Sequence, residues 1–215
     1  GYLLMSPVLT AVSNAAEAAV NFLINARLLP LAAFIIEPAK VLFLNNALNH
    51  GVLAPLGVSA VEESGRAIHF LLETNPGPGL GLLIAYFVAG KGLLKDSAPS
   101  AMIVHFLGGI HEIYFPYVLA HPIMILSVIA GGFAANLWFT IFNAGLVATP
   151  SPGSIFAYLA VIPRGQHFAV LMGVLIGAVA SFLVGSFILK VRPVKETDEE
   201  EEDVEDETVA VPGLA

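Results

Sequence analysis

The 215-residue sequence is 57% hydrophobic and only 12% charged, with a mean hydropathy of +0.82. Soluble globular domains carry roughly a quarter of charged residues, so this composition excludes that class. It predicts an all-α polytopic membrane protein. The sequence has no cysteine, which excludes disulfides, thiolate metal sites and a cysteine nucleophile.

The net charge of −8 arises in the C-terminal tail, since ten of the seventeen acidic residues fall between Glu196 and Glu207. Such a polyanionic run cannot bury apolar surface, so we expect residues 193–215 to be a disordered, solvated tail. Binding of a basic partner is the alternative interpretation of this tail. No nucleic-acid partner is expected.

The first predicted element is a spanning helix of about 20 residues within residues 7–36, broken at Pro30. The chain begins without an initiator methionine or a basic leader, so we expect it to be the later part of a longer protein. After the helix, Glu37 and Lys40 stand three residues apart. In a helix they would be neighbours that partly neutralise each other, and a surface turn explains the pair equally well.

A cluster of neutral polar side chains follows the apolar residues 41–44. In a helix, Asn45 and Asn49 share one face. Asn46 and His50 lie on the adjoining face. This density of donors and acceptors favours hydrogen bonding to hydroxyl groups over binding of an ion or an apolar ligand. The alternative is an interfacial helix cap, because asparagine is a common capping and turn residue.

Residues 58–70 have the pattern of an amphipathic helix near the membrane interface. Beyond it, Glu73 precedes a Pro/Gly-rich run at residues 75–79, which we expect to be a turn that is not regular helix. Glu73 then sits at a helix end, where it is either a ligand group or a solvated carboxylate. A short apolar run follows at residues 80–89.

The run Gly108–Tyr117 places His111 and Glu112 side by side in apolar surroundings. A carboxylate there is costly unless it faces a polar cavity or a partner, so the pair is predicted to be a functional site. The alternative is a structural role, in which both side chains hydrogen-bond each other or nearby backbone. Paired glycines, and Pro116 acting on residue 115, predict a broken helix that is buried in protein or lines a water-filled space.

Two apolar spans are predicted in the second half of the chain, at residues 122–147 and 168–189. The second span carries small residues at four-residue spacing, which form a stripe where another helix can pack closely. These residues are Gly173, Gly177, Ser181 and Gly185.

The basic residues predict the topology of the chain. Three of them directly follow the last span and predict a cytoplasmic C-terminus, and Lys91 and Lys95 mark a second cytoplasmic loop. The chain must then cross the membrane an even number of times between this loop and the C-terminus. The two apolar spans satisfy this requirement, which leaves residues 101–119 as a re-entrant hairpin. After a Pro/Ser-rich loop at 148–154, residues 155–162 are expected to form a further short re-entrant piece.

Four motifs occur in order within residues 3–192, and their ranges are Glu37–Gly51, Glu73–Gly79, His105–Tyr117 and Ser151–Ile155. With these motifs the sequence resembles the membrane-embedded C domain (EIIC) of the mannitol permeases of the bacterial phosphoenolpyruvate-dependent phosphotransferase system. The resemblance implies transmembrane helices with re-entrant hairpins and a homodimer in the bacterial plasma membrane. It also implies that residues 1–192 are the C-terminal portion of the EIIC domain.

The resemblance implies a mannitol site built from His50, Glu73, His111 and Glu112. The pattern of the residues themselves adds Asn45 and Asn49. In this family a phosphocysteine on a B domain (EIIB) donates the phosphoryl group. Because this chain has no cysteine, phosphorylation requires another chain or a missing continuation. Glu112 is the candidate general base that takes the proton of the sugar hydroxyl.

Several alternatives remain open from the sequence. One is a permease of the same system for another polyol or for fructose, and another is a proton-coupled secondary transporter in which His111 and Glu112 carry the proton. An inactive fragment is a third. An intramembrane zinc enzyme is disfavoured because Phe115 stands where the zinc-helix motif needs its second histidine. No metal and no cofactor are expected.

Overall fold

The computed structural model describes residues 11, 14–15, 18–19, 22–23 and 28–193. Within these ranges the chain is helical without a strand, and extended backbone pairs only in one isolated bridge between Ala67 and Leu146. The all-α fold class is therefore confirmed. The expected acidic tail lies outside the described residues apart from residue 193, as does most of the first expected helix.

The first described helices include the asparagine-rich cluster of residues 45–50. They are η1 (Leu29–Ala32, a 3-10 helix), α2 (Ala33–Val41), α3 (Asn45–Leu48), η2 (Asn49–Leu53, a π-helix), α4 (Ala54–Ser64) and α5 (His69–Thr74). Pro30 stands in the first turn of η1, and the chain is helical from there to Val41. Of the two interpretations of Glu37 and Lys40, the helical one is correct.

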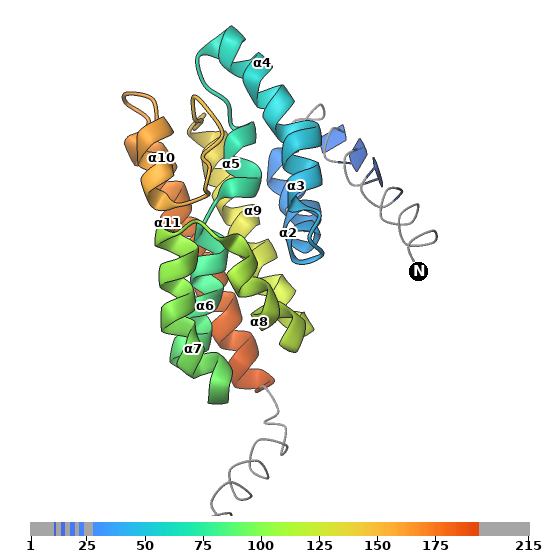
Figure 1. Ribbon diagram of the computed structural model, residues 1–215, viewed down its shortest axis with the longest axis vertical. Helices are drawn as coiled ribbons and strands as arrows, with labels where there is room; N and C mark the ends of the chain where they lie inside the picture. The colour runs from blue at the N-terminus through green and yellow to red at the C-terminus, as the bar shows by residue number, and fades with distance from the viewer. Residues whose placement is uncertain (1–10, 12–13, 16–17, 20–21, 24–27, 194–215) are drawn as a thin grey trace, which may run out of the picture.

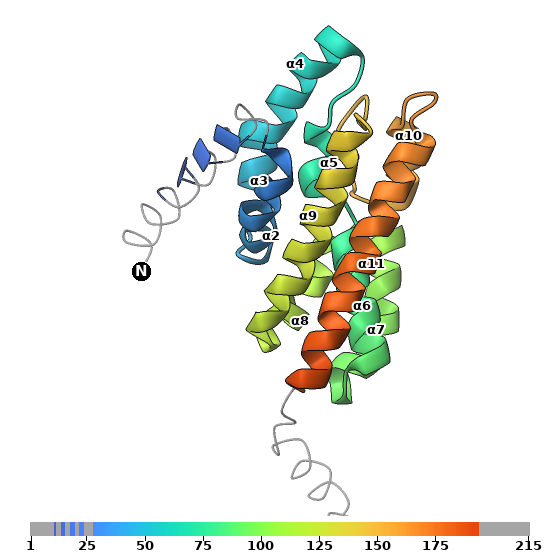
Figure 2. The same ribbon diagram turned by 180° about the vertical axis from the view of Figure 1, so that it is seen from behind.

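The centre of the molecule is formed by three helices that lie side by side, α6 (Gly77–Ala89), α9 (Ile125–Ile141) and α11 (His167–Val191) (Figures 1 and 2). Two segments are long and apolar enough to cross a membrane, Pro122–Ile141 and His167–Val191. Both predicted spans are thus found, although the first is shorter than expected. It ends because the chain turns at Asn143, whose φ of 47° leaves the helical region.

The stripe of small residues on α11 packs against α6 and α9, as the sequence predicts. A Cβ at Gly81 of α6 would collide with the carbonyl oxygen of Ala178, and a Cβ at Gly131 of α9 would lie 2.6 Å from the carbonyl oxygen of Gly177. Across the α9–α11 contact, Ser127 Oγ donates a 3.0 Å hydrogen bond to the carbonyl of Ser181. The three helices therefore pack backbone to backbone, the usual way that apolar helices associate without a hydrophobic driving force.

The prediction of one amphipathic helix over residues 58–70 is wrong for the second half of that range. Helix α4 ends at Ser64, and Gly65 takes the left-handed conformation that commonly ends helices (φ 75°). The chain then extends so that the amide of Ala67 donates to the carbonyl of Leu146 (2.8 Å), and the carbonyl of Ala67 accepts from the amide of Leu146 (3.0 Å). This tertiary bridge, which local sequence does not reveal, separates α4 from α5.

The expected Pro/Gly turn is also shorter than predicted. Within residues 73–79, the chain leaves the helical conformation at Asn75 and Pro76 alone. Gly77, Pro78 and Gly79 form the first turn of α6. Proline is tolerated there because the first amide groups of a helix have no intrahelical acceptor. Asn75 Oδ1 accepts one of them, from the amide of Gly77 at 2.9 Å.

The predicted break near His111 exists, but proline does not cause it. Helix α7 (Gly92–Met102) continues as the π-helix η3 (Ile103–Leu107), and the chain then turns at Gly109, whose φ is +77°. Phe115 has ordinary α-helical angles, and Pro116 stands in the first turn of α8, so the expected effect of Pro116 is wrong. Helices α7 and α8 lie in the same half of the molecule, which gives this segment a hairpin path (Figure 1). Its position relative to a membrane stays a prediction.

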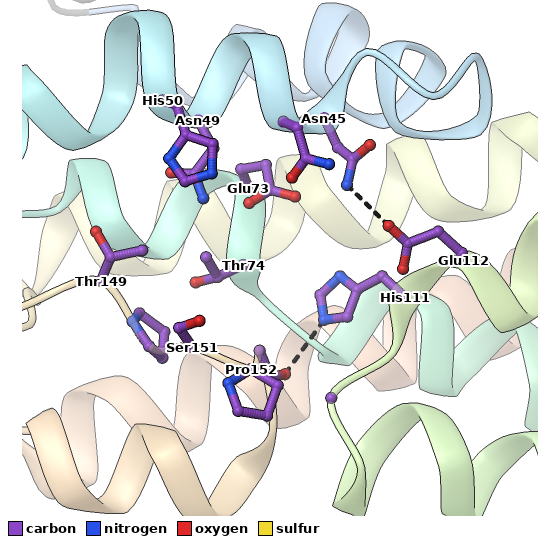
Figure 3. A pocket seen from close by; sticks show the side chains of 14 residues that line it. Asn45, Asn49, His50, Glu73, Thr74, His111, Glu112, Thr149, Ser151 and Pro152 are labelled. Carbon is purple, nitrogen blue, oxygen red and sulfur yellow. Dashed lines mark hydrogen bonds between the residues drawn. The ribbon is translucent and has the colours of Figure 1, made fainter.

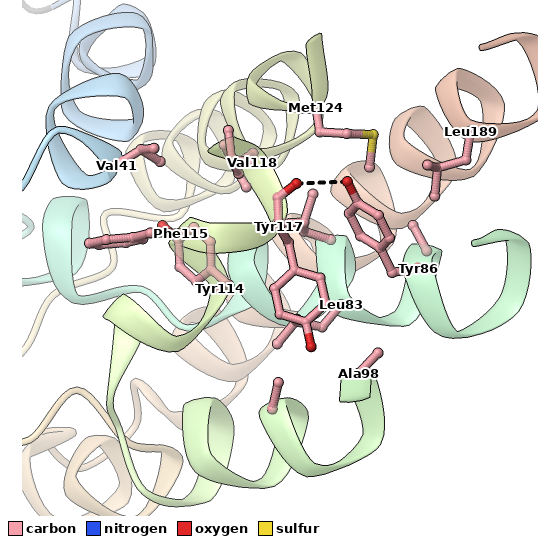
Figure 4. Packing of buried hydrophobic residues seen from close by; sticks show 14 of the residues in the cluster. Val41, Leu83, Tyr86, Ala98, Tyr114, Phe115, Tyr117, Val118, Met124 and Leu189 are labelled. Atoms are coloured by element: carbon pink, nitrogen blue, oxygen red, sulfur yellow. Dashed lines mark hydrogen bonds between the residues drawn. The ribbon is translucent and has the colours of Figure 1, made fainter. Parts of the chain in front are cut away.

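After the break come η4 (His111–Tyr114, a 3-10 helix), α8 (Phe115–Ala120) and η5 (Pro122–Met124), and the last short helix is α10 (Ile155–Val161). Buried aromatic side chains hold η4 and α8 against α6 (Figure 4). Tyr114 and Phe115 are fully buried, and Tyr86 of α6 donates a 2.7 Å hydrogen bond to the carbonyl of Tyr117. This packing fixes the backbone on which His111 and Glu112 stand.

The turn between α6 and α7, which carries Lys91, lies at the same end of the molecule as the C-terminal end of α11 (Figures 1 and 2). The topology predicted from basic residues requires this arrangement. Which side of a membrane this end faces stays a prediction.

Candidate functional site

A cavity of about 180 Å³ opens where the asparagine-rich helices, the end of α5, the break before η4 and the α9–α10 loop meet (Figure 3). It is lined by Asn45, Asn46, Asn49, His50, Glu73, Thr74, Gly109, His111, Glu112, Thr149, Pro150, Ser151, Pro152 and Gly153. All six residues predicted to bind substrate are among them. Residues from separate parts of the sequence therefore share one cavity.

The asparagines project from the short helices α3 and η2. Asn45 is buried, and its Nδ2 donates a 3.2 Å hydrogen bond to Oε1 of Glu112 (Figure 3). Asn49 and His50 open the π-helix η2 and line the same side of the cavity. The alternative of a helix cap finds no support, because Leu44 occupies the N-cap of α3 and no side chain caps that end.

Glu73 and Thr74 bring the end of α5 into the cavity. Glu73 is only 6% exposed, so of the two interpretations of this carboxylate, the solvated one is wrong. Thr74 Oγ1 makes a 2.8 Å hydrogen bond with the hydroxyl of Tyr158 in α10, which ties the two elements together. A carboxylate this deeply enclosed needs a polar partner, and the cavity is where such a partner can bind.

His111 and Glu112 both line the cavity, and each hydrogen-bonds a different partner, Gly153 for His111 and Asn45 for Glu112. His111 Nε2 lies 3.2 Å from the carbonyl oxygen of Gly153, so this nitrogen carries the proton and donates it. The ring of His111 also lies 4.7 Å from that of His105, whose Nε2 donates to the carbonyl of Pro76 at 2.9 Å. His111 thus makes the backbone contact that the structural interpretation predicts while it also faces the cavity.

A buried ion pair lies in α2, which precedes the asparagine-rich helices of the cavity. Lys40 Nζ and Glu37 Oε1 are 3.0 Å apart, and both side chains are 1% exposed. The sequence shows the helical spacing of this pair, but its burial depends on packing that the sequence does not reveal. In particular, Gly132 of α9 leaves room for Glu37.

The cavity wall formed by Thr149–Gly153 was not predicted from the sequence. The motif Ser151–Ile155 was part of the family resemblance, which is the signal that could have found it. Within the described residues, no group of three or more His, Cys, Asp or Glu side chains could hold a metal ion. The lining offers amides, imidazoles, hydroxyls and two carboxylates, a set suited to a neutral ligand rich in hydroxyl groups.

The long apolar helices, together with a polar cavity that shorter helices and a loop form, define an α-helical membrane protein with a polar site. The family model described as "Phosphotransferase system, EIIC" matches residues 1–132. The chain therefore belongs to the EIIC family of the bacterial phosphotransferase system, whose members are membrane proteins. The resemblance inferred from its motifs is confirmed.

Curated relatives cover nearly the whole chain. It is 58% identical over 194 residues to a "PTS system mannitol-specific EIICB component" of Geobacillus stearothermophilus and 54% identical over 194 residues to the protein of the same name in Bacillus subtilis strain 168. Each match covers 90% of this chain and 41% of the relative. A "PTS system mannitol-specific EIICBA component" of Escherichia coli K12 is 50% identical over 198 residues, 92% of this chain and 31% of the relative. The chain thus spans less than half the length of these relatives. No solved structure matches it.

Proposed function

We propose that this chain is the membrane part of a mannitol permease, which binds mannitol and carries it across the bacterial plasma membrane for phosphorylation by an EIIB domain. The observation that carries the proposal is the convergence of Asn45, Asn49, His50, Glu73, His111 and Glu112 on one cavity. The names of the relatives, which describe mannitol-specific EIICB and EIICBA components, support both the substrate and the partner.

The chemistry of the cavity suits an acyclic polyol. Each hydroxyl of a polyol both donates and accepts, and the lining provides carboxylates that accept, amides that do both and imidazoles that do either. At about 180 Å³ the cavity is smaller than pockets for drug-sized ligands, which measure about 300–1,000 Å³. Among the described residues that line it there is no lysine or arginine, so a sugar phosphate would meet Glu73 and Glu112 without a compensating cation from this lining. The site therefore favours the neutral substrate over its charged product.

In the proposed reaction a terminal hydroxyl of bound mannitol attacks the phosphorus of a phosphocysteine on EIIB. A new oxygen–phosphorus bond forms, the sulfur–phosphorus bond breaks, and the cysteine leaves as a thiolate. The hydroxyl proton passes to the carboxylate of Glu112, whose Oε1 is oriented by Asn45. A base in this position contributes about 10²–10⁴ in rate. A rigid-body movement of the site relative to a dimeric partner would expose the sugar to each side in turn.

The test is phosphoenolpyruvate-dependent formation of mannitol phosphate by membranes that contain the chain, with EIIB and the soluble components supplied. Mannitol is expected to appear inside vesicles only as the phosphate, whereas a proton-coupled transporter would accumulate free sugar. Competition of labelled mannitol by fructose and other polyols tests the related permeases. Glu112→Gln should lower the phosphorylation rate at least about 100-fold, and Glu63→Gln, on the exposed part of α4, should not. If Glu112→Gln also abolishes binding, Glu112 acts as a ligand first.

A further inference from the structure

The loop between α9 and α10 forms a wall of the cavity that the proposed function has not used. Figure 3 shows Thr149 and Ser151 across the cavity from Asn49 and His50. In the same view Thr149 and Glu112 stand at opposite ends. A linear ligand with its terminal hydroxyl at Glu112 therefore extends towards this loop.

The loop is held in place from three directions. The carbonyl of Gly153 accepts the hydrogen bond from His111 Nε2. Ser154, which is buried, caps α10 by accepting from the amide of Ala157 at 3.2 Å. Gly109 packs so closely against the loop that a Cβ there would lie 2.6 Å from the amide nitrogen of Ser154. Groups carried by this loop are therefore positioned before any ligand binds.

The hydroxyls of Thr149 and Ser151 have no hydrogen-bond partner within the described part of the chain, and both residues line the cavity. Thr149 is half-buried and Ser151 is exposed. Other threonine and serine hydroxyls near the site are already engaged, such as that of Thr74 with Tyr158. Two free hydroxyls on a fixed loop are groups that a polyol can bind.

We propose that Thr149 and Ser151 bind the end of the polyol remote from Glu112, and that they make the site select for chain length. The inference rests on the proposed function and adds to it the residues that determine specificity. Under this proposal a long polyol held at Glu112 presents its far hydroxyls to Thr149 and Ser151, whereas a shorter polyol held at Glu112 leaves them unused. Loss of the hydroxyls should therefore weaken binding of the longer ligand alone.

The test measures binding of labelled mannitol to membranes containing the chain, and competition by the four-carbon polyol erythritol. The variants are Thr149→Val, Ser151→Ala and their combination. Matched controls outside the cavity are Thr140→Val on α9 and Ser59→Ala on α4. Each cavity variant should lower mannitol affinity about 2- to 12-fold, the range for one hydrogen bond, and the combination by more. Erythritol affinity should stay within twofold of wild type.

Two results would overturn the inference: a double variant that binds mannitol within twofold of wild type, or equal losses for mannitol and erythritol. Thr149→Ser keeps the hydroxyl and removes the methyl group, so it distinguishes hydrogen bonding from packing. It should bind mannitol like wild type, and a loss as large as that of Thr149→Val would contradict the proposed contact. A wild-type chain that fails to bind mannitol would instead refute the proposed function, and this inference with it.

Discussion

Asn45 and Glu112, which are 67 residues apart in the sequence, are joined by a hydrogen bond of 3.2 Å from the amide Nδ2 to the carboxylate Oε1. The bond connects the asparagine-rich helix α3 with the 3-10 helix η4 that follows the break in the chain. It occupies one oxygen of Glu112. The two motifs that the sequence marks most clearly therefore share one site.

This contact predicts different effects for two substitutions of the same residue. Asn45→Ala removes one hydrogen bond, and mannitol affinity should fall about tenfold. Asn45→Asp places a second carboxylate beside Glu112, so the loss should be larger, because two like charges at this distance repel. Equilibrium binding of labelled mannitol measures both. An Asp variant that binds at least as well as the Ala variant would show that the contact does not orient an ionised Glu112.

Much of the candidate site follows from the sequence because its residues break local rules. Ionisable and amide side chains within apolar runs, such as His111 and Glu112, are costly unless they share a polar space, and that cost makes them visible. The long apolar helices are equally visible from their length. The bridge between Ala67 and Leu146 is different, because neither of the two segments has a local sequence pattern that predicts it.

Other features need the packed structure for the same reason. The burial of Glu37 and Lys40 depends on the space left by Gly132 of a distant helix. Thr149 and Ser151 lie in a Pro/Ser-rich loop whose composition predicts a loop and not its place, and its contacts with His111 and Gly109 hold it at the cavity. Proline in a first helical turn is sterically acceptable, which is why Pro78 and Pro116 did not break helices as expected.

The buried pair Lys40–Glu37 predicts a non-additive effect on stability. Lys40→Met leaves the Glu37 carboxylate buried without its cation, and breaking such a pair costs about 3–5 kcal/mol. The double variant Lys40→Met with Glu37→Gln removes both charges and should recover most of that loss. Thermal unfolding of the purified chain in detergent measures each variant. Equal destabilisation by the single and the double change would contradict a coupled pair.

The close contact between α6 and α11 predicts sensitivity to a single methyl group. Gly81→Ala places a Cβ against the carbonyl oxygen of Ala178, and overpacking of this kind costs about 1–3 kcal/mol. Val179→Leu enlarges an exposed residue of α11 and serves as the control, with little change expected. The measurement is a comparison of the melting temperatures of the two variants in detergent. The packing account fails if Gly81→Ala melts no lower than Val179→Leu.

The turn at Gly109 predicts that alanine at this position weakens mannitol binding more than backbone strain alone would. Gly109 and Gly165 both have positive φ, 77° and 84°, so alanine at either position carries a similar conformational cost. Only at Gly109 would the new Cβ also meet the loop, at the amide of Ser154, whereas nothing lies within 4 Å at Gly165. Gly109→Ala should therefore weaken mannitol binding, and Gly165→Ala should leave it unchanged. Matching affinities for the two variants would argue against a fixed loop.

The central claim is that one cavity brings together polar groups from distant motifs to hold a linear polyol. Its most direct test is equilibrium binding of labelled mannitol to membranes that contain the chain, compared among the wild type, His50→Ala, Glu73→Gln and Glu112→Gln. The account predicts saturable binding by the wild type and a loss of at least about tenfold for each variant, the value of one hydrogen bond to a charged or buried group. Absence of saturable binding by the wild type, or unchanged affinity in all three variants, would contradict it.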